Sequence, residues 1–177
     1  MKRTTFIEAM DVWRTPERIV LVTSVDADGL PHVITVGWKM RTSFNPIMFA
    51  IAVGHDRYMH KCISESQEFV IAIPGSDLAE ESLTCGKQGE KVDRFEKCGL
   101  EKLAAHSIKS PLIKNCLANF ECNVTKQVET GDHTLFVGEV VNAWVNEKSG
   151  KNLLIVGDED GYDVLAEEGP YRVGIVK

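Results

Sequence analysis

The chain has 177 residues, of which 44% are hydrophobic, 26% are charged and 7% are aromatic. This length and composition exclude collagen, coiled coil and intrinsic disorder, and are typical of one globular domain. The 20 basic residues are scattered along the chain, and the 26 acidic residues bring the formal net charge to −6. A nucleic-acid-binding surface is therefore not expected, because such a surface gathers Lys and Arg into one patch.

The apolar runs are short and the cysteines are isolated. The longest runs, 49–53 and 153–156, fall far below the roughly 20 residues of a membrane span. The five cysteines, at 62, 85, 98, 116 and 122, contain no C-x-x-C pair, so no metal site is expected. We expect a cytoplasmic protein that binds no membrane, with one domain over 1–177, a core at about 14–156 and reduced, packed cysteines.

The first elements read as a hairpin. Two β-branched runs, 18–25 and 30–38, flank a turn that contains Gly29, and a glycine-containing turn between such runs is a hairpin signal. Pro31 lies at the start of the second run, where a missing backbone donor is tolerated. We therefore expect two adjacent antiparallel strands here.

A buried strand and a short helix are expected next. Residues 47–53 are apolar almost throughout, as in a strand covered on both faces. Asp56 is the expected N-cap of the following helix, which places Met59, Cys62 and Ile63 on one face. Another strand is expected over 68–73.

The second half of the chain predicts further short helices and long strands. The expected elements are helices over 77–85 and 92–98, an irregular stretch over 103–115, strands over 118–129 and 133–145 joined by a glycine turn, and a last strand over 153–156 before an acidic tail. About six strands in consecutive hairpins favour a mainly β, closed antiparallel barrel over alternating βαβ units.

Phosphate-loop chemistry is missing from the sequence. The segment Gly86-Lys87-Gln88-Gly89 has neither the spacing nor the strand-to-helix setting of a dinucleotide fingerprint or a Walker loop. A Rossmann enzyme and a P-loop NTPase are therefore excluded.

Three segments carry side chains suited to an anionic or planar ligand. Arg57, His60 and Lys61 cluster at a helix start, which can bind phosphate, although a solvated helix face is the commoner explanation of such a cluster. His133 follows a turn, where it can donate a proton near neutral pH or be an ordinary surface residue. Trp38 is either a core aromatic or a platform for a planar cofactor, with Gly37 allowing close approach.

Taken together, these segments resemble the flavin reductase-like family, the FMN-binding split barrel of the flavoredoxin type. The resemblance covers about 14–156 and rests on the order and spacing of Val22-Thr23-Ser24, Asp28-Gly29-Leu30-Pro31-His32, Ile34-Thr35-Val36-Gly37-Trp38, Ser43-Phe44-Asn45-Pro46, Arg57-Tyr58-Met59-His60-Lys61, Glu68-Phe69-Val70, Cys85-Gly86, Val92-Asp93-Arg94-Phe95 and Gly131-Asp132-His133-Thr134-Leu135-Phe136-Val137-Gly138-Glu139-Val140. It implies a six-stranded antiparallel split β-barrel, Greek-key-like, that forms a homodimer and binds one FMN per subunit near the subunit interface.

The resemblance also implies which residues contact the flavin. Thr35, Val36, Gly37 and Trp38 would lie along the isoalloxazine, and His32 stands where the family usually has Asn. The segment Arg57-Tyr58-Met59-His60-Lys61 corresponds to the phosphate-binding turn and helix start, with Met59 where Thr is common. The remaining implied contacts are Arg94 and His133 at the pyrimidine edge, Cys85 of the Cys-Gly step, with packing as its default role, and Tyr162 or Tyr171 over the ring.

The implied activity is an NAD(P)H-dependent flavin reductase in which His133 orients the nicotinamide or stabilises reduced flavin. The reduced FMN would pass to a partner monooxygenase, or its electrons to ferric iron or a quinone. Three alternatives stay open. They are a flavoredoxin-like carrier with tightly bound FMN reduced by a ferredoxin-like protein, a barrel that binds a small molecule without flavin, and a barrel similar to pyridoxamine-phosphate oxidase.

Overall fold

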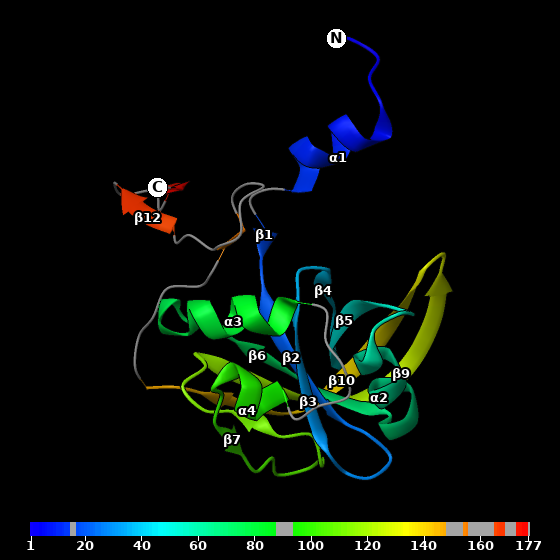
Figure 1. Ribbon diagram of the computed structural model, residues 1–177, viewed down its shortest axis with the longest axis vertical. Helices are drawn as coiled ribbons and strands as arrows, with labels where there is room; N and C mark the ends of the chain where they lie inside the picture. The colour runs from blue at the N-terminus through cyan, green and yellow to red at the C-terminus, as the bar shows by residue number, and fades with distance from the viewer. Residues whose placement is uncertain (15–16, 88–93, 148–153, 156–164, 169–172, 177) are drawn as a thin grey trace.

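The computed structural model describes residues 1–14, 17–87, 94–147, 154–155, 165–168 and 173–176. Its main feature is a seven-stranded antiparallel sheet in the order β3-β2-β6-β9-β10-β5-β4 (Figure 1). The strands are β2 (Val20–Val25), β3 (Pro31–Val36), β4 (Lys39–Phe44), β5 (Ile47–Gly54), β6 (Glu68–Ile73), β9 (Ala118–Thr130) and β10 (His133–Val145). The expected mainly β, antiparallel fold is therefore confirmed, with seven strands in the sheet rather than six.

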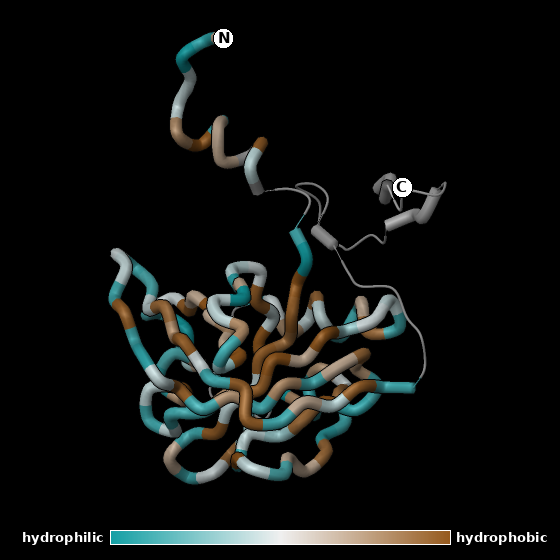
Figure 2. The backbone as a smooth tube through the Cα atoms, turned by 180° about the vertical axis from the view of Figure 1, so that it is seen from behind, coloured by the Kyte–Doolittle hydropathy of each residue, from teal (hydrophilic) through white to brown (hydrophobic). Residues whose placement is uncertain are grey.

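The shorter elements surround this sheet. The helices are α1 (Phe6–Arg14), α2 (Tyr58–Ser66), the 3₁₀ turn η1 (Ser76–Leu78), α3 (Ala79–Gly86) and α4 (Arg94–Cys98). Three two-stranded ladders pair β1 (Glu17–Arg18) with β11 (Leu154–Ile155), β7 (Lys102–Leu103) with β8 (Leu112–Ile113), and β12 (Leu165–Glu168) with β13 (Val173–Val176). Figures 1 and 2 show α1 projecting away from the sheet.

The additional strand comes from a bend at Gly37. The sequence pattern indicates one strand over 30–38, but the chain leaves β3 at Val36 and begins β4 at Lys39. Strands β3 and β4 occupy opposite ends of the sheet order, so the bend carries the chain from one edge to the other. Among the described strands no ladder joins these two edges, which makes the barrel split rather than closed.

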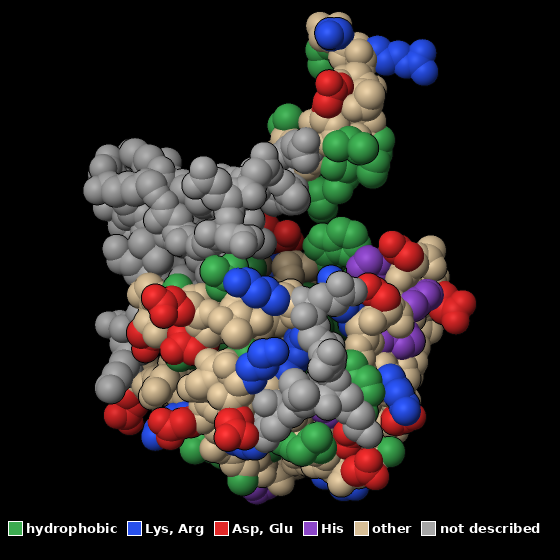
Figure 3. Space-filling model, in the orientation of Figure 1, with side chains coloured by type: hydrophobic (Ala, Val, Ile, Leu, Met, Phe, Trp, Pro, Cys, Tyr) green, Lys and Arg blue, Asp and Glu red, His purple; other side chains and the backbone are tan. Residues whose placement is uncertain are grey.

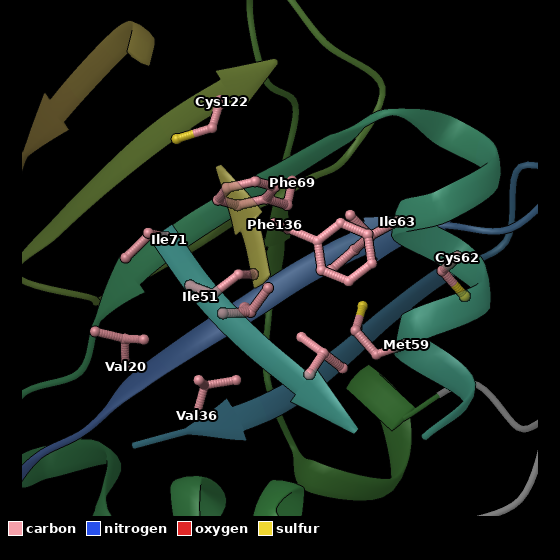
Figure 4. Packing of buried hydrophobic residues seen from close by; sticks show 12 residues of the cluster. Val20, Val36, Ile51, Met59, Cys62, Ile63, Phe69, Ile71, Cys122 and Phe136 are labelled. Atoms are coloured by element: carbon pink, nitrogen blue, oxygen red, sulfur yellow. The ribbon is translucent and has the colours of Figure 1, made fainter. Parts of the chain in front are cut away.

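Two apolar clusters cover the two faces of the central strands. Val20 and Val22 of β2 belong to the cluster that includes Phe69 and Phe136 and packs against α2 (Figure 4). Leu21, between them, belongs to the second cluster, which includes residues of α3 and α4. Alternate side chains of a strand point to opposite faces, so β2 is buried on both sides along its whole length.

The ends of several elements differ from the sequence prediction. The N-cap of α2 is Arg57, without a side-chain cap bond, and Asp56 was the wrong choice. The helix expected over 77–85 is divided into η1 and α3, and the irregular stretch over 103–115 includes the short strand β8. Helix α1 and the β12–β13 ladder were not expected from the sequence pattern.

A buried carboxylate fixes the first hairpin to α2. Asp26 accepts hydrogen bonds from His32 Nε2 at 3.1 Å and from the Tyr58 hydroxyl at 3.2 Å. The backbone N–H groups of Asp28 and Leu30 donate to it at 3.1 and 2.9 Å. Burial alone raises a carboxyl pKa, but these bonds outweigh it and lower the pKa of Asp26 to about 2. The ionised carboxylate therefore holds the β2–β3 turn against the first residue of α2.

The Asp26→Asn variant should be less stable than the wild type at pH 7. The difference in the free energy of unfolding between the two proteins should shrink as the pH falls. The carboxyl pKa is about 2 in the folded chain and about 3.9 in an unfolded one, so the ionised group contributes about 2.6 kcal/mol. This contribution is complete above the unfolded-state value and is lost as the pH falls through the folded-state value. Urea unfolding of both proteins between pH 7 and pH 3 measures this difference in the free energy of unfolding.

The control for this experiment is Glu80→Gln, because Glu80 is an exposed carboxylate. The free energy of unfolding of Glu80→Gln should stay close to that of the wild type throughout the pH range. A gap for Asp26→Asn that is equally large at pH 7 and pH 3 would contradict the assignment of a stabilising ionised carboxylate.

Candidate functional site

A cavity of about 260 Å³ lies at the bend between β3 and β4. The end of β3, the end of β5 and the last turn of α3 line it, together with single residues from β1, α4 and β10. The hydrogen bond from the Ala52 N–H to the Trp38 carbonyl, at 2.9 Å, fixes the bend against β5. The cavity is therefore built from segments that are distant in the sequence.

Backbone rather than side chains forms part of the cavity wall. A Cβ atom on Gly37 would lie 3.0 Å from Glu17 Oε2, and one on Gly54 would lie 2.8 Å from Asp56 Oδ1. Both distances are shorter than an undisturbed contact allows, so a side chain at either position requires a shift of its neighbour. The carboxylates of Glu17 and Asp56 therefore occupy the space beside these two glycines.

An aromatic pair borders the cavity. The rings of Trp38 and His133 have centroids 4.6 Å apart with an interplanar angle of 33°. His133 Nδ1 lies 2.7 Å from Asp132 Oδ1, and this hydrogen bond lowers the pKa of Asp132. The bond assigns Nδ1 as a donor, so Nε2 carries no proton in the neutral ring. Trp38 is 50% exposed, so part of its indole face is accessible.

Two guanidinium groups lie at the cavity. Arg94 donates from Nη1 to the Cys85 carbonyl at 3.3 Å and from Nη2 to the Lys87 carbonyl at 2.9 Å. Carbonyls at a helix C-terminus carry partial negative charge, so Arg94 joins the start of α4 to the end of α3. Arg57 Nε lies 3.7 Å from Asp56 Oδ1, and its side chain is 42% exposed. The cavity therefore offers cationic groups on two sides.

One anionic group lies in the same wall. Glu17 Oε1 is 3.9 Å from Lys39 Nζ, and burial is the main cause that lowers the pKa of Lys39.

On another side, the Thr35 hydroxyl donates to the Ser82 carbonyl. This bond connects β3 to α3 across the cavity and occupies the only proton of the hydroxyl.

The structure brings together eight of the thirteen residues that the sequence analysis singled out. Those eight line the cavity, and they are Thr35, Val36, Gly37, Trp38, Arg57, Cys85, Arg94 and His133. His32 and Tyr58 lie instead at Asp26, while Met59 is buried in the first apolar cluster.

The three basic residues near the start of α2 lie in different surroundings. Of these, Arg57 lines the cavity. His60 Nε2 lies 2.8 Å from the Thr134 hydroxyl, and burial is the main cause that lowers the pKa of His60. Lys61 is 61% exposed, with its Nζ 3.7 Å from Glu65. They therefore do not form one basic face.

Six cavity residues were not singled out from the sequence, although Ile34 and Gly86 stand in quoted motifs. They are Glu17, Ile34, Ala52, Val53, Gly54 and Gly86. Gly54 reaches the cavity because β5 pairs with β10 in the register that sets it opposite His133. That register is a long-range property, so a pattern within one segment does not reveal it. Tyr162 and Tyr171 lie outside the described residues.

A second, apolar hollow of about 650 Å³ adjoins the cavity. Met10 and Trp13 of α1 line one side of it, and Met40 and Leu135 of the sheet line another. Trp38 borders both spaces. Figure 3 shows hydrophobic side chains on α1 and on the part of the sheet domain below it. None of the described helices is long and apolar enough to cross a membrane.

Comparison with known proteins identifies relatives of the chain. A protein from Archaeoglobus fulgidus, of uncharacterised function, is 44% identical over 113 residues, which are 63% of this chain and 64% of that protein. The NADH-dependent FAD reductase of Streptomyces globisporus is 27% identical over 130 residues, 72% of this chain and 69% of that protein.

The fold is shared with solved structures. The flavoredoxin of Methanosarcina acetivorans superposes with a TM-score of 0.77 at 25% sequence identity, over 98% of this chain and 94% of that one. The family model described as "Flavin reductase like domain" matches residues 12–163, which is most of the chain. This protein therefore belongs to the flavin reductase-like family.

Proposed function

We propose that the protein binds FMN in the cavity at the β3–β4 bend and reduces it with NADH or NADPH. The observation that carries this proposal is the combination of a backbone-walled cavity, the Trp38–His133 ring pair and two arginines at one site. The name of the Streptomyces relative, an NADH-dependent FAD reductase, supports a nicotinamide donor. FAD is therefore the competing flavin to be measured beside FMN.

The residues present fit a flavin. The half-exposed Trp38 supplies an apolar face at the cavity against which the flat flavin ring can stack. Arg57 is the residue proposed to pair with the phosphate, because its guanidinium is partly exposed at the cavity. When bound, a flavin accepts a hydride from reduced nicotinamide.

Two residues are proposed to favour the reduced state. Arg94 is fixed at the cavity by its bonds to the Cys85 and Lys87 carbonyls, so its positive charge is held in place. His133 is oriented by Asp132, which accepts from Nδ1, so Nε2 donates a hydrogen bond when the ring is protonated. Preorganised positive and donor groups stabilise negative charge that develops on reduction.

A flavoredoxin-like electron carrier is the second candidate. The Methanosarcina flavoredoxin superposes over 98% of this chain, and the acidic net charge of −6 would steer the protein toward a partner with a basic docking patch. In this case a redox protein replaces the nicotinamide as donor.

Anaerobic stopped-flow absorbance separates these functions. The protein is saturated with FMN and mixed with NADH or NADPH, and the visible flavin band is followed. Rapid bleaching supports the reductase. A persistent band from bound FMN supports the carrier, and failure to bind FMN or FAD would contradict both.

Replacement of Arg57 and Lys61 tests the phosphate site. Arg57→Ala should weaken FMN affinity by about 10- to 100-fold, because a charge-assisted hydrogen bond is worth about 1.5–3 kcal/mol. Lys61→Ala is the matched control, since Lys61 is exposed beside Glu65, and its affinity should stay within about twofold of the wild type. Fluorescence titration measures both. Equal losses in the two variants would remove the assignment to Arg57.

The role of His133 is tested by reduction kinetics with binding measured separately. His133→Ala should slow flavin reduction by about tenfold or more while FMN stays bound, because a donor that acts on the transition state is lost. His106→Ala is the control, since His106 does not line the cavity. An unchanged reduction rate in His133→Ala would contradict the role proposed for this side chain.

We also propose that the chain is a homodimer. Large apolar side chains are exposed on α1 and β4, where Phe6, Ile7 and Trp13 are 77%, 72% and 73% exposed and Phe44 is 80% exposed. An exposed apolar patch of this kind marks an interaction surface. Light scattering should give twice the chain mass of 19.7 kDa, and Trp13→Asp combined with Phe44→Asp should shift it toward the monomer. A monomeric wild type would contradict the proposal.

A further inference from the structure

Two thiols lie together at the wall of the cavity. Cys85, in the last turn of α3, lines the cavity and is 1% exposed. Cys98, the last residue of α4, is 7% exposed and belongs to the same apolar cluster. Their thiols are close enough for each to shift the pKa of the other. The sequence analysis assigned packing to Cys85 because no second cysteine is near it in the sequence, and the fold supplies that neighbour.

The structure holds the two thiols in place. Arg94 begins α4 and donates to the carbonyl of Cys85 itself. Its second bond, to the Lys87 carbonyl, joins the same two helix ends. Cys98 follows Arg94 by about one turn of α4, so these two bonds hold the helix that carries Cys98 against the end of α3.

The two sulfurs are electrostatically different. The hydrogen bond from the Cys85 thiol lowers the pKa of Cys98 against the opposing effect of burial, and Arg94 and Lys97 lower it further. The same bond, with burial, raises the pKa of Cys85. A thiolate is the reactive form of cysteine, so Cys98 is the sulfur that ionises first.

The other three cysteines differ from this pair. Burial is the main cause that raises the pKa of Cys62 and of Cys116 to about 12, and it also raises the pKa of Cys122. Inert, buried thiols of this kind behave as small hydrophobic residues.

We propose that Cys85 and Cys98 form a redox-active dithiol that exchanges an electron pair with the flavin of the adjoining cavity. The inference rests on the proposed function. Oxidation breaks the two S–H bonds and forms one S–S bond. The two electrons and one proton pass to the oxidised flavin, and the second proton passes to solvent. Fully reduced protein then stores four electrons per chain, two in the dithiol and two in the flavin.

The dithiol is tested first without flavin. The chain is equilibrated anaerobically in mixtures of oxidised and reduced dithiothreitol, and is then quenched in acid and alkylated. The masses of its peptides are measured by mass spectrometry. A single disulfide that links Cys85 to Cys98, with a two-electron dependence on the redox ratio, is expected. Cys98→Ala should abolish it, whereas Cys116→Ala, a change in the same cluster, should retain it. Five free thiols in the most oxidising mixture, or a disulfide to another cysteine, would overturn the proposal.

The exchange is tested next with FMN bound. The oxidised, loaded protein is titrated anaerobically with dithionite. The wild type should take up four electrons per flavin and Cys98→Ala should take up two. In a control without flavin, the disulfide of the wild type should persist over the same time. Uptake of two electrons by the wild type would overturn the exchange. Failure to bind flavin would overturn both the proposed function and the electron exchange. The peptide masses from the flavin-free experiment would still show whether the Cys85–Cys98 disulfide forms.

Discussion

The bend of the backbone at Gly37 and Trp38 is the constraint on which the site depends. It takes the chain from β3, at one end of the sheet order, to β4, at the other. The residues of the bend line the cavity together with the ends of β3 and β5. A Cβ at Gly37 would press on Glu17, so the residue with no side chain stands where the chain turns and where the wall must be thin.

Buried carboxylates hold the rest of the barrel around that bend. Asp26 fastens the β2–β3 turn to α2 through Tyr58. Glu121 of β9 accepts hydrogen bonds from the backbone N–H groups of His106 and Ser107, at 3.0 and 2.7 Å, and from Trp144 Nε1 at 2.7 Å. Burial raises the pKa of Glu121, but these bonds outweigh it and lower that pKa. The ionised groups in the core are thus satisfied by donors, whereas Arg57 at the cavity keeps a partly exposed side chain.

The strands were predictable because their signals are local. The apolar run of β5 and the glycine turns before β3 and β10 place those strands within a few residues of their observed bounds. The bend at Gly37 was not predictable, because β-branched residues continue up to it and only the pairing of β4 with β5 reveals a new strand. The same limit applies to the site. Arg57 and Lys61 look equivalent in sequence, and only the fold separates a cavity residue from a solvated one. Cys98 became a neighbour of Cys85 in the same way.

The central claim is that the cavity at the β3–β4 bend is where flavin binds. A crystal structure of the protein grown with FMN tests it most directly. The account predicts density for the ring along Thr35, Gly37 and Trp38, with the phosphate at Arg57. Density in the apolar hollow under α1, with the cavity at the bend free of ligand, would contradict it.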